Sequence, residues 1–127
     1  MQCRGIRGAV VVSANSKKAI LSSTKKLLTQ MAQANDIEIR DIAAILFTTT
    51  KDLNAEFPAA AARELGWPSD LALLCGHEMD VPGALPHCLR VLMLVNTLKR
   101  PDEMVHVYLG EAMRLKDKAS PAIGGDT

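Results

Sequence analysis

Aromatic side chains are scarce in this chain: two Phe, one Tyr and one Trp are spread over 127 residues. Because 48% of the residues are nevertheless apolar, the core has to be built from Ala, Val, Leu, Ile and Met. No apolar run reaches the roughly 18 residues that cross a bilayer, and the first residues, MQCRGIRG, lack the pattern of a secretory signal. We therefore expect a soluble, cytoplasmic protein that has no membrane partner.

The net charge and the number of cysteines are also low. The formal net charge is +1 and no run rich in Lys and Arg stands out, so the basic footprint of a nucleic-acid binder is missing. Three cysteines cannot form a complete disulfide framework, and we expect reduced thiols. The sequence also lacks a Gly-rich phosphate loop and a nucleophile elbow. These absences argue against nucleic acid as a partner and against the chemistry that those two motifs serve.

Apolar periodicity predicts alternating strands and helices over most of the chain. Strands are expected at 6–12, 42–50, 71–75, 88–97 and 105–115, and helices from a cap at Asn15 or Ser16 to about Asn35 and from Pro58 to a stop at Gly66. We predict an α+β fold with a single mixed β-sheet of about five strands and helices on one face. Residues 1–115 would form one domain, and residues 116–127, which lose all periodicity, a flexible C-terminal tail.

The connections between the expected strands predict their pairing. The long helix between the first two strands implies a right-handed parallel crossover. The short turn at Pro101 and Asp102 implies that the last two strands pair antiparallel. The sheet face without helices would present Ala, Val, Leu and Met to water, so we expect an oligomer.

Two arginines interrupt apolar strands. Arg7 shares a strand face with Ala9 and Val11, and Arg90 lies in LRVLMLVNT. A lone buried charge is very costly, so Arg90 needs a partner. One interpretation is an internal salt bridge between Arg90 and Glu78, with Arg7 solvated at a strand end. The other is a pocket for an anionic ligand, since guanidinium groups suit the recognition of carboxylates.

The segment CGHEMDVPGALPHCLR (75–90) also raises the question of a metal site. Cys75 and His77 are spaced to share one face of an extended segment. His87 and Cys88 are adjacent and would point to opposite faces, so only one of them could join. Three ligands at best do not make a closed structural zinc site. We therefore predict no metal site.

Four segments together resemble a known enzyme family: RGIRGAV at 4–10, DLNAEFPAAAAREL at 52–65, CGHEMDVPGALPHCLRV at 75–91 and HVYLGEAMRL at 106–115. They are similar to the trimeric chorismate mutases of the α/β-barrel class, which differ from the all-helical class. The resemblance implies a homotrimer whose sheets close into a pseudo-α/β-barrel with active sites at the subunit interfaces. It also implies the conversion of chorismate to prephenate, on the route to phenylalanine and tyrosine, with no metal or organic cofactor.

The resemblance also implies roles for four residues that the preceding paragraphs considered from their residue type and position. Arg7 matches an arginine that contacts a substrate carboxylate, and Arg90 matches one placed against the breaking ether oxygen. Glu78 matches a glutamate near the ring hydroxyl, and Cys75 a cysteine that assists there. These four residues are the expected catalytic residues.

Four further residues match substrate-binding positions of the family, with Arg7 and Arg90. Tyr108 matches a tyrosine that holds the enolpyruvyl side chain, and Leu115 an apolar pocket wall. Phe57 and Arg63 match positions supplied by the neighbouring subunit. From the residues alone, Tyr108 is equally a packing residue with a bonded hydroxyl, Phe57 a staple at a helix start, and Arg63 a solvated helix residue.

Three positions depart from the family pattern: Ala60 stands in place of a lysine, Leu74 in place of a small polar residue, and Lys116 in place of an arginine. These changes concern substrate capture more than chemistry, and the tail would close over the site.

An alternative function is a non-catalytic trimeric binder or regulator of a carboxylate metabolite, which Arg7 and Arg90 fit equally well. A third interpretation is an interaction module with internal salt bridges.

Overall fold

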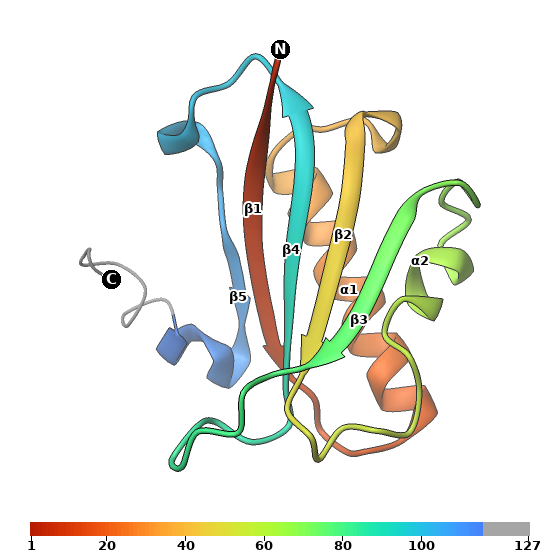
Figure 1. The fold of residues 1–127 in the computed structure, drawn as a ribbon, viewed down its shortest axis with the longest axis vertical. Coiled ribbons are helices and arrows are strands. Elements are labelled where there is room, and N and C mark those ends of the chain that lie inside the picture. Colours follow the sequence, from red (N-terminus) through yellow and green to blue (C-terminus); the bar gives the residue numbers. More distant parts are fainter. Residues whose placement is uncertain (116–127) are drawn as a thin grey trace.

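The computed structural model describes residues 1–115, which form one five-stranded sheet with helices on one of its faces (Figure 1). The elements in chain order are β1 (Gln2–Val11), α1 (Lys17–Ala34), the 3-10 helix η1 (Ile39–Asp41), β2 (Ile42–Thr49), α2 (Ala60–Glu64), β3 (Ala72–His77), β4 (Cys88–Thr97), η2 (Pro101–Glu103), β5 (Val107–Leu109) and η3 (Gly110–Ala112). The predicted α+β fold with a mixed sheet is confirmed. The expected tail at 116–127 lies outside the described residues.

The strand order is β3-β2-β4-β1-β5. Strand β4 lies at the centre and runs antiparallel to both β1 and β2, while β3 is parallel to β2 and β5 is parallel to β1. The helix crossover between β1 and β2 therefore joins two strands of the same direction, as predicted, with β4 inserted between them.

The predicted pairing of the last two strands is wrong. Both edges of β4 are already hydrogen-bonded, to β1 and to β2, so β5 pairs with the free edge of β1 instead. The fifth strand is also shorter than the predicted 105–115. Gly110 has a φ of +58° and starts η3, which ends the extended chain after Leu109.

Local sequence accounts for the ends of the helices. Ser16 caps α1, because its hydroxyl accepts a hydrogen bond from the Ala19 N–H at 3.1 Å. Asn35 ends the same helix, and its amide donates to the Met31 carbonyl at 2.8 Å. Gly66, with a φ of +78°, follows α2 and stops it as predicted.

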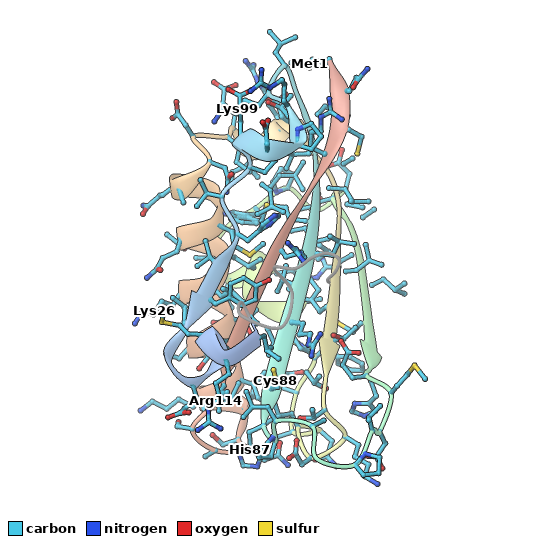
Figure 2. The ribbon with its side chains drawn as sticks, turned by 90° about the vertical axis from the view of Figure 1, so that its left-hand side faces the viewer. Met1, Lys26, His87, Cys88, Lys99 and Arg114 are labelled. Atoms are coloured by element: carbon cyan, nitrogen blue, oxygen red, sulfur yellow. The ribbon has the colours of Figure 1, made fainter. Side chains whose placement is uncertain are left out.

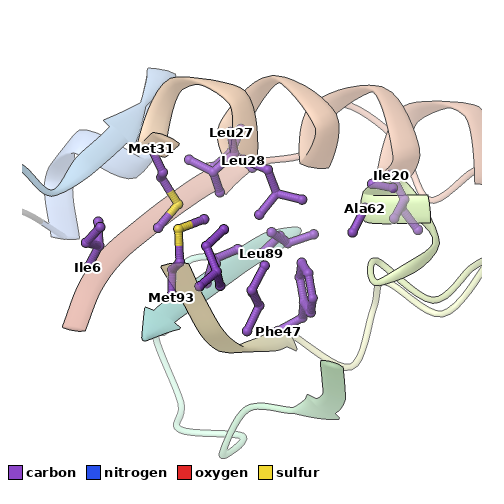
Figure 3. Packing of buried hydrophobic residues seen from close by; sticks show 14 of the residues in the cluster. Ile6, Ile20, Leu27, Leu28, Met31, Phe47, Ala62, Leu89 and Met93 are labelled. Atoms are coloured by element: carbon purple, nitrogen blue, oxygen red, sulfur yellow. The ribbon is translucent and has the colours of Figure 1, made fainter. Parts of the chain in front are cut away.

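The core lies between α1 and the face of the sheet that the helices cover (Figure 3). Side chains alternate along each strand, so every second residue of β1, β2 and β4 points to α1. The largest of the fully buried side chains are aliphatic, apart from one ring: Ile6, Ile20, Leu27, Leu28, Met31, Ile45, Phe47, Leu53, Leu89 and Met93. An aliphatic core is the arrangement that the scarcity of aromatic residues predicted.

Among the residues that the structure describes, no helix covers the opposite sheet face, which we call the open face (Figures 1 and 2). It presents Arg7, Thr48, Arg90 and Leu92, and at the sheet edge Leu74, which is 65% exposed. An uncovered face was predicted from the sequence, but its apolar side chains are interrupted by Arg7, Thr48 and Arg90. Among residues 1–115, no helix is both long and apolar enough to cross a membrane.

Candidate active site on the open sheet face

A hollow of about 500 Å³ lies on the open face, over β1, β4, β2 and the segment around β5. Its polar side chains are Arg7, Thr48, Glu78, Arg90 and Tyr108, and its apolar lining comes from residues that include Leu46, Leu92 and Leu115. The structure therefore gathers five of the eight predicted site residues in one place: Arg7, Glu78, Arg90, Tyr108 and Leu115.

The two arginines reach the hollow from adjacent strands. Arg90 of β4 is paired in register with Ala9 of β1, and Arg7 is paired with Leu92. Arg7 and Arg90 are thus offset by two residues on neighbouring strands and point to the same face. Two cations in a hollow with apolar walls form a site for an anion.

Glu78 supplies the opposite charge at the same hollow. It follows β3 directly, and its backbone N–H donates to the Thr49 carbonyl at 2.8 Å. The Thr48 hydroxyl donates to Glu78 Oε2 at 2.5 Å, and Arg90 Nε lies 3.7 Å from the same oxygen. The side chains of Arg90 and Glu78 are 49% and 31% exposed, so this ion pair is open to a ligand rather than sealed in the core.

Tyr108 and Leu115 form the wall of the hollow at its β5 side. Tyr108 is paired in register with Ala9 and lies on the same face as Arg7. His106, two residues before Tyr108, accepts a hydrogen bond from the Arg7 backbone N–H at its Nδ1, at 2.9 Å. Burial and the charge of Arg7 lower the pKa of His106 below its ordinary value of 6.5.

Cys75 and Phe57 lie away from this hollow. Cys75 is paired in register with the buried Phe47, so it points to the helix side of the sheet, opposite to Arg90. Together with Phe57 it lines a second hollow of about 360 Å³, to which His77 and Glu56 also contribute. Burial raises the pKa of the Cys75 thiol, which disfavours the thiolate that a nucleophile needs.

Arg63 lies on α2 and lines neither hollow. Within one chain the structure thus leaves Cys75, Phe57 and Arg63 apart from the five residues of the open face. Over the described residues, no group of three or more His, Cys, Asp and Glu side chains is arranged to hold a metal ion.

Two residues of the site were not found by reasoning from the sequence. Thr48 bonds Glu78, and His106 bonds the backbone of Arg7. The strand pattern places Thr48 on the open face, yet its position beside Arg90 depends on the register of β2 with β4. His106 belongs to one of the segments with the family resemblance, but its contact depends on the parallel pairing of β5 with β1, which was predicted wrongly.

Comparison with known proteins decides the family. A model of the family "Chorismate mutase type I" matches residues 3–119, nearly the whole chain. This chain belongs to the type I chorismate mutases. The chorismate mutase AroH of Thermus thermophilus is 46% identical over 114 residues, which cover 89% of this chain and 93% of that protein. The chorismate mutase AroH of Bacillus subtilis is 40% identical over 120 residues, which cover 94% of each.

The fold agrees with this assignment. The solved structure of a chorismate mutase from Clostridium thermocellum superimposes with a TM-score of 0.84 at 51% identity, over 87% of this chain and 97% of that one. The predicted resemblance and chorismate mutase function are thereby confirmed. Of the positions that depart from the family pattern, Ala60 begins α2 and Leu74 lies exposed on β3, while Lys116 lies outside the described residues.

Proposed function

We propose that this chorismate mutase converts chorismate to prephenate in the hollow of the open face, as an isomerase on the route to phenylalanine and tyrosine. The observation that carries the proposal is the grouping of Arg7, Arg90 and Glu78 in one hollow of about 500 Å³ with apolar walls. A biosynthetic role of this kind fits a cytoplasmic enzyme, and we infer that location.

The reaction defines what the site has to supply. Within one molecule an ether C–O bond breaks and a C–C bond forms, so no nucleophile, proton or redox partner is consumed. The flexible enolpyruvyl group has to be held over the ring. Binding it in this geometry lowers the entropic part of the activation barrier. Charge separates in the transition state, with negative charge on the ether oxygen and positive charge on the ring. Fixed charges that meet this separation stabilise the transition state more than the ground state.

The charged residues of the hollow fit these requirements. We assign Arg90 to the ether oxygen and a carboxylate, and Arg7 to a substrate carboxylate. Glu78 would then face the ring and stabilise its positive charge. Its carboxylate is oriented by the Thr48 hydroxyl at 2.5 Å. Tyr108 would hold the enolpyruvyl group, and the apolar wall would exclude water, which strengthens each of these charge interactions.

We further propose that the active enzyme is a homotrimer with its sites at the subunit interfaces. The open face supports this, because Leu92 at its centre is 39% exposed and Leu74 at its edge is 65% exposed. Phe57 is also 70% exposed beside Cys75. In a trimer, the second hollow with Cys75 and Phe57, together with Arg63, would complete the site of the neighbouring subunit.

A binder of carboxylate metabolites without turnover is the second candidate function. Two arginines in a hollow favour it as much as they favour catalysis. Glu78 distinguishes the two, because a carboxylate 3.7 Å from Arg90 weakens the binding of a simple anion. The same carboxylate is an advantage where the bound molecule develops positive charge. We therefore favour the enzyme.

The direct test is turnover. Purified protein mixed with chorismate should remove the diene absorbance and produce prephenate, detected as phenylpyruvate after acid treatment. The rate should be the same with and without a chelator. Binding of chorismate without any loss of the diene would support the binder instead.

A further inference from the structure

His106 occupies a fixed position between two anchored residues. Its predecessor Val105 is held by Asn35, a fully buried side chain at the end of α1. The Val105 N–H donates to Asn35 Oδ1 at 2.7 Å, and the Asn35 amide donates to the Val105 carbonyl at 2.9 Å. Its successor Val107 is paired with Gly8 in the β1–β5 ladder. The backbone on both sides of His106 is therefore constrained.

From this position the imidazole contacts a residue of the hollow. The Arg7 N–H donates to His106 Nδ1 at 2.9 Å. A nitrogen that accepts carries no proton, so the imidazole is neutral and its proton is on Nε2. The bond extends the β1–β5 connection by one step beyond the Gly8–Val107 pair. A side chain thus fixes the backbone of Arg7, whose guanidinium lines the hollow with Tyr108.

Protonation would reverse this contact. An imidazolium donates from both nitrogens, so Nδ1 would then present a proton to the Arg7 N–H. Burial disfavours the charged ring, and the Arg7 guanidinium repels it, so the pKa of His106 lies below 6.5. The neighbouring segments add further cations. Lys99 Nζ donates to the Asn35 carbonyl at 2.6 Å, and Arg4 Nε donates to the Lys99 carbonyl at 3.1 Å.

We propose that His106 is a positioning residue for Arg7: its neutral ring holds the Arg7 N–H for substrate binding, and its protonation in acid breaks this one hydrogen bond and weakens binding. The inference rests on the proposed function, in which Arg7 binds a substrate carboxylate. It goes further by assigning the acid sensitivity of binding to one residue that does not touch the substrate. Carboxylates of ordinary pKa are mostly ionised at about pH 5 and above, so the titration of the substrate itself does not produce this effect.

Two variants separate the effect of the hydrogen-bond acceptor at position 106 from the effect of its protonation. His106→Asn keeps an oxygen where Nδ1 lies and does not titrate, whereas His106→Leu has no acceptor. KM and kcat would be measured from about pH 5 to about pH 8 at constant ionic strength. We expect the KM of the unmodified enzyme to rise about three- to tenfold in acid, the effect of losing one hydrogen bond, with kcat changed little. The Asn variant should have the same KM at both ends of this pH range, and the Leu variant should have a raised KM at every pH.

His87→Asn is the matched control. His87 lies at the foot of β4 (Figure 2), outside the hollow, and has a φ of +50°, a conformation that Asn adopts readily. This variant should keep the rise of KM in acid. The proposal is overturned if His106→Asn keeps the rise, if His106→Leu binds substrate as the unmodified enzyme does, or if His87→Asn loses the rise.

A second measurement does not depend on turnover. In NMR spectra the Arg7 amide proton should shift with pH, with a midpoint below 6.5, and this shift should be absent in His106→Asn. An Arg7 amide that does not respond to pH would contradict the role of His106 even in an active enzyme. Absence of chorismate turnover at every pH would instead contradict the proposed function.

Discussion

Arg90 Nε and Glu78 Oε2 lie 3.7 Å apart at the floor of a hollow, and neither side chain is buried. An isolated pair of this exposure contributes little to stability. The two charges matter more for a bound substrate that contacts both side chains and separates charge as it reacts. The pair that the sequence suggested as an internal salt bridge is therefore present, but its location favours two poles of a site.

The first prediction concerns the hydrogen bond from Thr48 to Glu78. Thr48→Val has the same shape but lacks the hydroxyl that donates to Glu78 Oε2. Because a hydrogen bond to a charged group is stronger than a neutral one, we expect kcat to fall about tenfold. Thr48→Ser keeps the hydroxyl and should retain most of the activity. Equal kcat values for the Val and Ser variants would show that Thr48 does not orient the glutamate.

Most of the elements could be predicted from the sequence because local patterns determine them, whereas the candidate site residues were brought together by the family resemblance. Alternation along the strands put Arg7 and Arg90 on defined faces, and the Ser16 cap and Gly66 stop marked helix ends. The pairing of β5 could not be predicted in this way. It depends on which strand edge is still free after β4 has taken its central place, and that is a property of the whole sheet.

The same limit applies to the site. The family resemblance assembled eight residues without saying which belong to one chain's hollow. The structure brings five of them together and places Cys75 on the other face of the sheet, because it is paired with Phe47. Thr48 and His106 were missed since a hydroxyl and an imidazole become informative only when their partners across the sheet are known. The roles of the site residues stay predictions.

The second prediction concerns Gly8, which lines the hollow and faces α1 on its other side. A Cβ at this position would meet Met31 Sδ and would lie 3.2 Å from Leu27 Cδ1. Gly8→Ala should therefore lower the free energy of unfolding by about 1–3 kcal/mol, the usual cost of overpacking. In a Met31→Ala background the same substitution should cost much less. Additive effects in this double-mutant cycle, measured by urea unfolding, would contradict the close packing of α1 on β1.

The third prediction concerns Asp52, which holds the start of β4. Its carboxylate accepts the His87 N–H at 3.0 and 3.2 Å and the Thr50 hydroxyl. Partial burial opposes the charge, but these bonds and the charge of His87 outweigh it, so the pKa of Asp52 is lowered. A lowered pKa in the folded state stabilises the fold above the unfolded value of about 3.9, and the contribution is lost as pH falls below it.

Asp52→Asn should consequently be less stable than the unmodified protein at about pH 7, and this difference should shrink at about pH 3. Urea unfolding at both pH values measures it. Asp70→Asn, which changes an exposed carboxylate, is a suitable control and should change little. A stability difference for Asp52→Asn that is the same at both pH values would mean that its charge is not what holds His87.

The fourth prediction tests the open face as an interface. Leu92→Glu places a carboxylate at the centre of this face, where a partner subunit would bury it without a counter-charge. Analytical ultracentrifugation should show a trimer for the unmodified protein and smaller species for the variant. Leu98→Glu, at a side chain that is 84% exposed just after β4, should remain a trimer. A Leu92→Glu trimer would place the interface elsewhere.

The steady-state kinetics of Arg90→Ala test the proposed mechanism most directly. The guanidinium lies beside Glu78 in the hollow and is assigned to the charge that grows on the ether oxygen. Its removal should lower kcat on the order of 100- to 1,000-fold, as the loss of one transition-state donor typically does. Arg100→Ala, at an exposed arginine bonded to Asp102, should leave kcat unchanged. A trimeric, folded Arg90→Ala enzyme with near-native kcat would contradict electrostatic catalysis at this hollow.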